Sequence, residues 1–534
     1  MNRIATTLAL LAGFAGRAEC RNNTNMVHDF KDVNPSAELV WAPCYDNFTC
    51  SRLEVPVDYA NQNASTTAIA FMKFAGKNAT SDSQAFMIIP GGPGGSSIDL
   101  LMEYKDMLGQ MFGDTYNFVG FDPRGIERSG PKMDCFRNNA TAREAFNRAH
   151  YTGATNTSSN SFEQQYYAAG IYGERCNEEV KTKSPFGYYV TTPAVVRDLL
   201  TFIEADAKLA GRKPSDAKLW GFGASYASVV GTTFASMFPN RVGRLVLESV
   251  MDVDQYYENN WRSNFVDSDK AFEQLPILCH AAGPDKCSIW GPTPENITAR
   301  IDAVIENIIS HPIPVSGIDG LTLPGLATYS DLKALIASGV YEPLTYFPIF
   351  SDVFAELENG NASALIGWTE KLYLGADIDV LIRCADSYRD NKLVTITDWK
   401  DYIEDTVASS KYIGDTFPIW ARTILCRSLK PELPDSMMLP GPVTGIGKPL
   451  ANPILFTSNT LDPVAPAPNA YKMASRFPGS TVLLQEAAGH PVTRQGGSPC
   501  YYEHIQGYLQ GVVPSANTTC PQEYFAFIDG PMQI

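Results

Sequence analysis

Positive charge and long apolar runs are both scarce in this sequence of 534 residues. Lys and Arg number 42 against 58 Asp and Glu, so the formal net charge is −16 and the pI lies near 4.9. Nucleic acids and anionic membrane surfaces are bound through basic faces, so this charge balance argues against both as partners. No run of about 18 uninterrupted apolar residues follows the N-terminal region, which argues against a membrane-spanning helix.

The eleven cysteines lack the spacing of a metal site, because no two of them form a CxxC pair. We therefore predict disulfides rather than zinc, and we expect no metal and no other cofactor. The N-terminus fits an oxidising destination. Met1-Asn2-Arg3 is basic, residues 4–16 are apolar but too short to span a bilayer, and Gly16-Arg17-Ala18 offers small residues for cleavage. This pattern predicts a secretory signal peptide over residues 1–18, with Cys20 at the junction as the odd cysteine.

Sites for N-linked glycans are dense along the chain. A single Asn-x-Ser/Thr sequon is common by chance, but nine in one chain fit a secreted, extracellular glycoprotein. The nine asparagines are Asn22, Asn47, Asn63, Asn78, Asn139, Asn156, Asn296, Asn361 and Asn517.

The most informative motif is Gly223-Ala224-Ser225-Tyr226-Ala227. It is a G-x-S-x-A form of the nucleophile elbow, where a strand turns sharply into a helix and the residues two before and two after the serine must be very small. An apolar run (residues 218–222) precedes the motif and a small-residue helical segment (228–233) follows it. We therefore predict that Ser225 is a nucleophile.

The other two members of a catalytic triad follow in the expected order. A serine hydroxyl needs an adjacent base that is itself oriented by a third group, and in α/β-hydrolases the chain order is Ser, Asp or Glu, then His. Asp462 comes just after an apolar run (452–457), and His490 comes after a second one (480–484). Both therefore lie past the carboxyl end of a predicted strand, where open α/β sheets build their sites. The remaining histidines lack this placement and are interpreted as structural or exposed: His28, His150, His280, His311 and His504.

A glycine-rich loop, PGGPGGS at residues 90–96, follows a predicted strand at 85–89. Acyl transfer builds negative charge on a carbonyl oxygen, and fixed backbone N–H groups stabilise it by roughly 3 kcal/mol each. We predict that the N–H groups of Gly92 and Tyr226 form this oxyanion hole. A phosphate-binding loop is the weaker alternative, because no Gly-Lys-Ser/Thr ending follows.

Short apolar segments alternate with helical patterns at both ends of the chain, which predicts an α/β fold, a mostly parallel sheet with helices on both faces. Between residues 254 and 442, amphipathic helical stretches bounded by Pro/Gly loops replace this pattern and predict an inserted helical cap. The predicted divisions are a signal peptide (1–18), the first part of the core (19–253), the cap (254–442) and the second part of the core (443–534).

Several longer motifs resemble one enzyme family. They are PGGPGGS (90–96), VGFDPRGIERSGP (119–131), TTPAVVRDL (191–199), FPNRVGRLVLESV (238–250), ILFTSNTLDPVAP (454–466) and AAGHP (487–491). In this order they resemble the tripeptidyl and prolyl aminopeptidase branch of the α/β-hydrolases, and residues 453–521 resemble that branch's C-terminal domain. Ala227, Glu127 and Pro491 stand where the family usually has glycine, which bears on substrate preference more than on catalysis.

The resemblance, together with proximity in sequence, also suggests how ten cysteines pair, although spacing alone leaves the connectivity open. The suggested pairs are Cys44–Cys50, Cys135–Cys176, Cys279–Cys287, Cys384–Cys426 and Cys500–Cys520.

The function that the resemblance implies is that of a secreted serine exopeptidase. Such an enzyme releases residues or short peptides from free N-termini through an acyl-enzyme on Ser225, with His490 as the base and Asp462 as its partner. A free amine needs a carboxylate in a closed pocket, and the candidates are Asp252, Asp254 and Asp386. We expect a peptide or a small acyl compound as the substrate, and the sequence predicts no oligomeric state.

Three alternatives stay open. A secreted esterase or lactonase would use the same triad, because the fold does not choose the acyl group. A serine carboxypeptidase would need Glu before the nucleophile and Asn before the Gly-Gly pair, where this chain has Ala224 and Pro90. A non-catalytic binding module on a hydrolase scaffold would usually have lost a triad member, and all three are present.

Overall fold

The structure is a computed structural model of the chain, and it describes residues 26–61, 63, 65–151, 153–317, 324–369 and 377–529. The predicted signal peptide, Cys20 and Asn22 lie outside the described residues. Among the described residues, no helix combines the length and the apolar character that crossing a bilayer requires.

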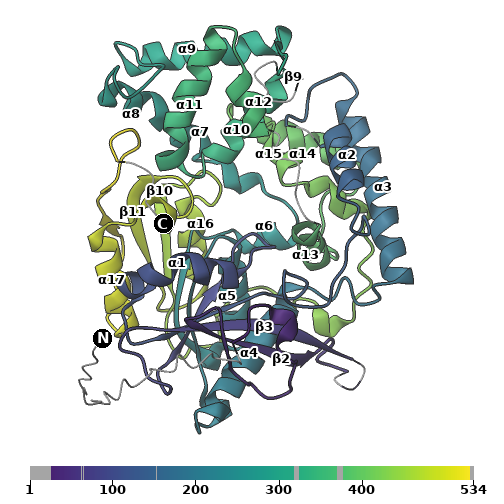
Figure 1. The fold of residues 1–534 in the computed structure, drawn as a ribbon, viewed down its shortest axis with the longest axis vertical. Helices are drawn as coiled ribbons and strands as arrows, with labels where there is room; N and C mark the ends of the chain where they lie inside the picture. Colours follow the sequence, from purple (N-terminus) through teal and green to yellow (C-terminus); the bar gives the residue numbers. More distant parts are fainter. Residues whose placement is uncertain are drawn as a thin grey trace, which may run out of the picture.

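One ten-stranded sheet forms the centre of the molecule, and it confirms the predicted α/β-hydrolase fold with a mostly parallel sheet (Figure 1). In spatial order its strands are β1 (Ala42–Cys44), β2 (Phe48–Pro56), β3 (Thr66–Ala75), β5 (Asn117–Phe121), β4 (Ala85–Ile89), β6 (Leu219–Ala224), β7 (Val242–Glu248), β10 (Leu455–Leu461), β11 (Thr481–Ala488) and β12 (Thr518–Cys520). The first three neighbouring pairs are antiparallel, and every pair from β5 to β12 is parallel. All five residues of β4 and of β5 are buried, as expected for strands covered on both faces.

Helices cover both faces of the sheet. On one face α1 (Ser97–Phe112) packs against α17 (Pro499–Leu509), and their buried side chains join those of β4 and β5 in one apolar core. On the other face α4 (Thr192–Leu209) packs against α5 (Tyr226–Met237), and this second core continues without a break into the cap. α16 (Ala467–Arg476) packs against β10 and β11.

The cap lies above the carboxyl ends of the parallel strands (Figure 1). Its main elements are α6 (Val253–Tyr257), η4 (Arg262–Phe265), α7 (Ser268–Phe272), α8 (Gln274–Ala282), α9 (Pro294–Ser310), α10 (Tyr329–Gly339), α11 (Pro343–Glu358), α12 (Ser363–Thr369), α13 (Ile378–Ser387), α14 (Ile396–Ser409), α15 (Phe417–Trp420) and η5 (Thr423–Ser428), with a small hairpin of β8 (Ile313–Val315) and β9 (Gly325–Ala327). Figure 1 shows α13 between the cap and the core.

The predicted cap boundaries need one correction, because a second segment of the chain belongs to the cap. α2 (Ala140–His150) and α3 (Ser161–Thr182) follow β5, far before residue 254, and α3 packs along η5 and α14. The helix α3 has a buried stripe that includes Ala169, Tyr172 and Cys176. Phe136 and Phe146 pack against Tyr172 from nearby in the chain, and η5 and α14 cover the helix from the distant part of the cap. The sequence does not reveal that α3 belongs to the cap, because η5 and α14 come more than 200 residues later in the chain.

The five suggested cysteine pairs are all bonded in the structure. Three of these disulfides join neighbouring elements that carry or support the site: Cys135–Cys176 holds α3, Cys384–Cys426 joins α13 to η5, and Cys500–Cys520 joins α17 to β12. The eight sequon asparagines within the described residues are all exposed, so each is sterically open to a glycan.

Candidate active site

Ser225 stands at the sharp turn between β6, which ends at Ala224, and α5, which begins at Tyr226. Its backbone has φ 62° and ψ −125°, a strained conformation that non-glycine residues seldom adopt and that clusters at active sites. The Ser225 N–H donates to the carbonyl oxygen of Glu248 at 2.9 Å, which ties the turn to the end of β7.

The small residues around Ser225 are required by contact distance. A Cβ atom added at Gly223 would lie 2.4 Å from the Cβ of Ala227 and 2.9 Å from the Cβ of Ile89. A side chain at position 223 would therefore displace Ala227 or the end of β4, which is why the elbow needs glycine there. The alanine in place of the usual glycine at 227 is fully buried in this turn.

His490 and Asp462 lie together at the carboxyl ends of β11 and β10. Nδ1 of His490 is 2.9 Å from Oδ2 of Asp462 and 3.1 Å from Oδ1, and both residues are buried. The N–H groups of Val464 and Ala465 donate to Oδ1 of Asp462 at 3.0 and 2.8 Å, which fixes the carboxylate. This arrangement favours the tautomer in which Nδ1 carries the proton and Nε2 is free to accept one.

The cap also holds the histidine. The backbone N–H of His490 donates to the carbonyl oxygen of Tyr341 at 2.7 Å, and the Tyr341 ring meets the imidazole edge to face with centroids 5.3 Å apart. On the core side, Glu248 accepts bonds from the N–H and the hydroxyl of Thr493 at 3.1 and 2.8 Å, three residues after the histidine. Burial raises the pKa of Glu248 above its ordinary value. The sequence analysis assigned no role to Glu248, although it lies within the motif at residues 238–250, or to Tyr341, which belongs to no motif.

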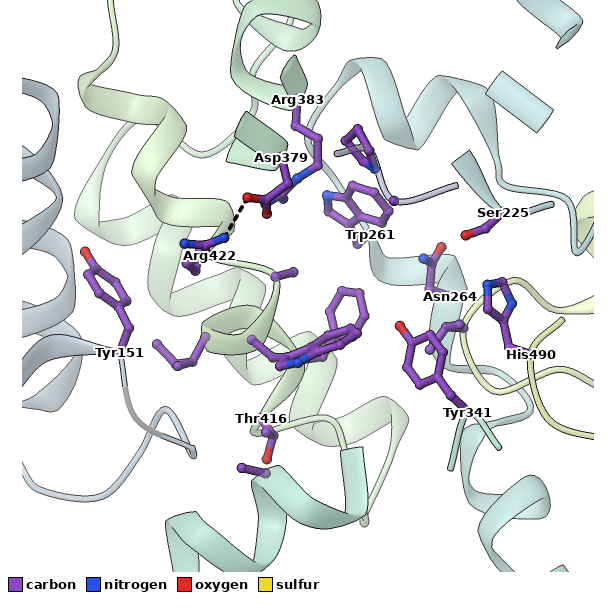
Figure 2. A pocket seen from close by; sticks show the side chains of 18 of the residues that line it. Tyr151, Ser225, Trp261, Asn264, Tyr341, Asp379, Arg383, Thr416, Arg422 and His490 are labelled. Carbon is purple, nitrogen blue, oxygen red and sulfur yellow. Dashed lines mark hydrogen bonds and ion pairs between the residues drawn. The ribbon is translucent and has the colours of Figure 1, made fainter. Parts of the chain in front are cut away.

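Ser225 and His490 line one cavity of about 480 Å³ between the core and the cap. Figure 2 shows both side chains at the same end of this cavity. The folded chain thus brings together all three residues that the sequence analysis assigned to the triad.

The two predicted oxyanion donors also lie at this end. Gly92 lines the cavity and has a φ of 113°, a conformation open to glycine, while Tyr226 is the first residue of α5. N–H groups in the first turn of a helix have no intrahelical acceptor and bind anions readily. The glycine loop packs on the elbow, because a Cβ atom at Gly91 would lie 3.1 Å from the carbonyl oxygen of Ala224 and 3.6 Å from the Cβ of Ser225. The role of these donors stays a prediction.

The three predicted substrate carboxylates lie elsewhere, and the prediction needs correction. Asp252 binds the ammonium of Lys472 at 2.8 Å, and the hydrogen bond from Arg476 holds the pKa of Asp254 at about 2. These two acids are paired to α16, 220 or more residues later in the chain, and neither is among the residues lining the cavity.

Asp386 is buried beneath the elbow rather than in the cavity. It accepts the N–H of Thr192 at 2.7 Å and the hydroxyl of Tyr256 at 2.8 Å, and the Thr192 hydroxyl lies 2.6 Å from that of Tyr226. Burial raises the pKa of Asp386 to about 7. Its position makes it a support for the residue that follows the nucleophile, with no route to a substrate amine.

The charged residues that do line the cavity come from the cap. They are Asp379 and Arg383 on α13 and Arg422 just before η5, and Figure 2 shows them grouped away from Ser225 and His490. Oδ1 of Asp379 accepts from Arg422 at 2.7 Å, and Oδ2 makes a long contact of 3.4 Å with Arg383. Asp379 is the one acidic residue among the described residues that line this cavity. Its spacing of four residues from Arg383 on one helix was the only sequence signal for this group.

Asn264 on η4 adds a neutral polar group to the wall of the cavity. The residue is only 4% exposed, and its backbone N–H donates to the carbonyl oxygen of Trp261 at 3.2 Å. Its side-chain amide therefore offers both a donor and an acceptor to the cavity.

A second cavity of about 370 Å³ meets the first at Gly92, Ser225 and His490. It lies on the core side, and most of its wall is apolar, with Ile89 of β4, Leu100 and Leu108 of α1, and Phe222 of β6. The reactive serine is therefore placed between a polar cavity under the cap and an apolar cavity over α1.

Known proteins resemble the chain along most of its length. The family model for TAP-like protein matches residues 431–520. Over 511 residues the chain is 24% identical to the tripeptidyl aminopeptidase of Streptomyces lividans, which covers 91% of this chain and 87% of that protein. It is 25% identical over 519 residues to the serine protease Hip1 of Mycobacterium tuberculosis, which covers 90% of both. A stretch of 91 residues, 16% of either chain, is 30% identical to carboxylesterase B of Mycobacterium tuberculosis. These findings confirm the resemblance that the motifs indicate.

Proposed function

Because this chain is a serine hydrolase of the α/β-hydrolase class related to the tripeptidyl aminopeptidases, we propose that it is a secreted exopeptidase that acts on free N-termini. It releases residues or short peptides through an acyl-enzyme. The observation that carries this proposal is a single cavity holding Ser225 and His490 at one end and the carboxylate of Asp379 on the cap side.

The chemistry begins at Ser225. Its Oγ attacks the carbonyl carbon of the scissile bond while Nε2 of His490 takes the hydroxyl proton. Asp462 accepts the Nδ1 proton in a hydrogen bond, keeps the tautomer and stabilises the imidazolium that forms. His490 then gives its proton to the leaving amine, and the peptide bond breaks to leave an ester on Ser225. A water molecule, deprotonated by His490, hydrolyses that ester and restores the serine.

The negative charge on the tetrahedral intermediate lies against the backbone N–H groups of Gly92 and Tyr226. Each preorganised donor lowers the barrier by roughly 3 kcal/mol. Both donors belong to rigid parts of the core, the loop after β4 and the first turn of α5, so little reorganisation is needed during the reaction.

The cap recognises the acyl side of the substrate. Among the described residues, Oδ2 of Asp379 has only the long contact with Arg383, so it has acceptor capacity left for the ammonium of a free N-terminus. The Asn264 amide can bind a peptide N–H or carbonyl between that terminus and the scissile bond. The apolar cavity over α1 remains for the leaving part of the substrate.

An esterase is the second candidate, and a specific observation favours it. The cavity over α1 is mostly apolar, which suits the leaving alcohol or acyl chain of a lipophilic ester, and the relative that is named carboxylesterase B shares a 91-residue stretch. The triad would serve this reaction equally well.

Secretion is part of the proposal. Five disulfides persist in oxidising compartments and are rare in the cytosol, and the eight described sequon asparagines are exposed. Mass spectrometry of the protein from culture medium, before and after glycosidase and without a reducing agent, tests glycans, the mature N-terminus and disulfides together. Eight or more reactive thiols in the denatured protein would contradict this part.

A panel of fluorogenic substrates tests the activity: one tripeptide with a free amine, the same peptide acetylated, and an ester of the same acyl group. The exopeptidase proposal expects the free-amine peptide to exceed the acetylated one by at least about 100-fold in kcat/KM, because acetylation removes the charge that Asp379 binds. Ser225→Ala serves as the blank. Equal cleavage of free and acetylated peptides, with faster ester turnover, would establish the esterase instead.

A further inference from the structure

Within the described residues, two guanidiniums and one carboxylate form the charged wall of the cavity. Arg383 and Arg422 share one carboxylate, Asp379. The next carboxylate along the chain, Asp377, accepts from Arg143 at 2.8 Å and from the Tyr172 hydroxyl at 3.1 Å, and it is not among the residues that line the cavity. A ligand that enters the cavity therefore meets two guanidiniums and a single carboxylate among the described lining residues.

Arg383 has unused hydrogen-bonding capacity. Its side chain is 5% exposed, and its Nη1 has no hydrogen-bond partner in the part of the chain that the structure describes. A buried guanidinium N–H without a partner loses its hydration and gains nothing in return, so such groups are rare unless a ligand satisfies them. The guanidinium also stands 5.8 Å from the ring of Trp261, which lines the same cavity.

The two guanidiniums are held in place by covalent and backbone constraints. Cys384, the residue after Arg383, is bonded to Cys426 on η5, four residues after Arg422. Arg422 itself has a φ of 51°, a left-handed conformation that costs free energy for a non-glycine residue and recurs at ligand sites. Both constraints reduce the ordering that binding would otherwise require.

We propose that Arg383 and Arg422 form a carboxylate-binding subsite, so that the enzyme prefers substrates whose N-terminal residue is Asp or Glu. The inference rests on the proposed exopeptidase function. Such a residue carries an ammonium and a carboxylate a few bonds apart. The ammonium lies against Oδ2 of Asp379, and the side-chain carboxylate lies against the guanidiniums on either side of it. A neutral or basic first residue brings its ammonium to the same wall but offers no carboxylate to Nη1 of Arg383.

The test measures kcat/KM of the wild-type enzyme on peptides that differ only in the first residue, X-Ala-Ala with a fluorogenic amide, where X is Glu, Gln, Ala or Lys. Glu and Gln have nearly the same shape, so their ratio reports the carboxylate alone. We expect kcat/KM for the Glu peptide to exceed that for the Gln peptide by at least about tenfold, because a well-placed guanidinium–carboxylate pair binds more strongly than a guanidinium–amide pair. Lys should be the poorest of the four. A Glu:Gln ratio of one or less would overturn the inference.

The variants assign the preference to the proposed residues. Arg383→Met should bring the Glu:Gln ratio close to one, and Arg383→Lys should retain part of it. The matched control is Arg389→Met, which removes one positive charge at an exposed ion pair with Asp435 just beyond α13 and should leave the ratio unchanged. Loss of the preference in the control as well would contradict the assignment to Arg383. If Arg383→Met does not fold, Arg422→Met gives a second reading of the same ratio.

Acetylated forms of the Glu and Gln peptides separate the two proposals. If acetylation has no effect but Glu is still preferred, the exopeptidase proposal fails and the carboxylate subsite stands. If free amines are required but Glu and Gln react equally, the exopeptidase stands and the subsite fails.

Discussion

The two ends of the cavity are built in different ways. At the catalytic end, Ser225, Asp462 and His490 each follow a strand of the parallel sheet directly, and close contacts such as that between positions 223 and 227 dictate the neighbouring residue types. At the other end, Asp379, Arg383 and Arg422 come from cap segments that meet only after folding. The core therefore fixes the chemistry with short-range constraints, and the cap is left to determine which substrate reaches it.

The largest effect is expected from the catalytic end. Ser225→Ala, His490→Ala and Asp462→Asn should each lower kcat by at least about 10³ on every substrate, and the effects should not add because the three residues act as a unit. Thermal unfolding should change little. A folded Ser225→Ala protein that kept more than a tenth of the activity would show that the nucleophile lies elsewhere.

Asp386 is a cap residue buried against the core, so its effect should appear in stability. Its pKa is raised to about 7 by burial, so the folded protein holds that proton more tightly than the unfolded chain. The associated stabilisation is full below about pH 4 and is lost as the pH rises through 7, by up to about 4 kcal/mol at 1.36 kcal/mol per unit. The free energy of unfolding of wild type and of Asp386→Asn can be measured in urea at pH 4.5, 6 and 8. The stability advantage of the wild type over the variant should become smaller at each step. Parallel pH curves would contradict the assignment.

Asp379→Asn should affect recognition of the substrate amine without affecting catalysis at Ser225. With a free-amine peptide, kcat/KM should fall by about 10- to 100-fold, because a partly exposed carboxylate no longer meets the ammonium. With an ester that has no amine, the same variant should stay close to wild type. An equal loss on both substrates would mean that Asp379 supports the catalytic end and recognises nothing.

The smallest effect is expected at Asp254, on the surface where the cap joins the core. Its low pKa comes from Arg476, and it does not line the cavity. Asp254→Asn should leave kcat/KM within about twofold and cost less than about 1 kcal/mol of stability, as other half-exposed ion pairs do. That cost should disappear as the pH falls from 4 towards 2, where the wild-type carboxylate is protonated too. If Asp254→Asn strongly lowered the preference for free-amine over acetylated peptides, Asp254 would bind the substrate amine after all.

How much of the site the sequence predicts follows from the same contrast. The sequence predicts the features that are local patterns at a strand end: the elbow, the glycine loop, Asp462 and His490. It does not predict the roles of Asp379 and Arg422, because no local pattern distinguishes one acidic or basic residue of the cap from another. The prediction that Asp252 and Asp254 bind the substrate was wrong for the same reason, because their partners Lys472 and Arg476 lie on α16, far along the chain. The fold was predictable down to its sheet, while α2 and α3 joined the cap through long-range packing that no periodicity reveals.

The hydrogen bond from His490 to the carbonyl oxygen of Tyr341 has a consequence for engineering. Tyr341 belongs to the cap, so the cap is not an exchangeable module: replacing it with that of another hydrolase, or deleting it to obtain a minimal enzyme, removes an anchor of the general base. Specificity is better changed side chain by side chain on α13 and η5, with residues 340–343 left as they are. Mutational tolerance across the cap should accordingly be uneven, with a narrow intolerant segment around Tyr341 inside a more permissive surrounding.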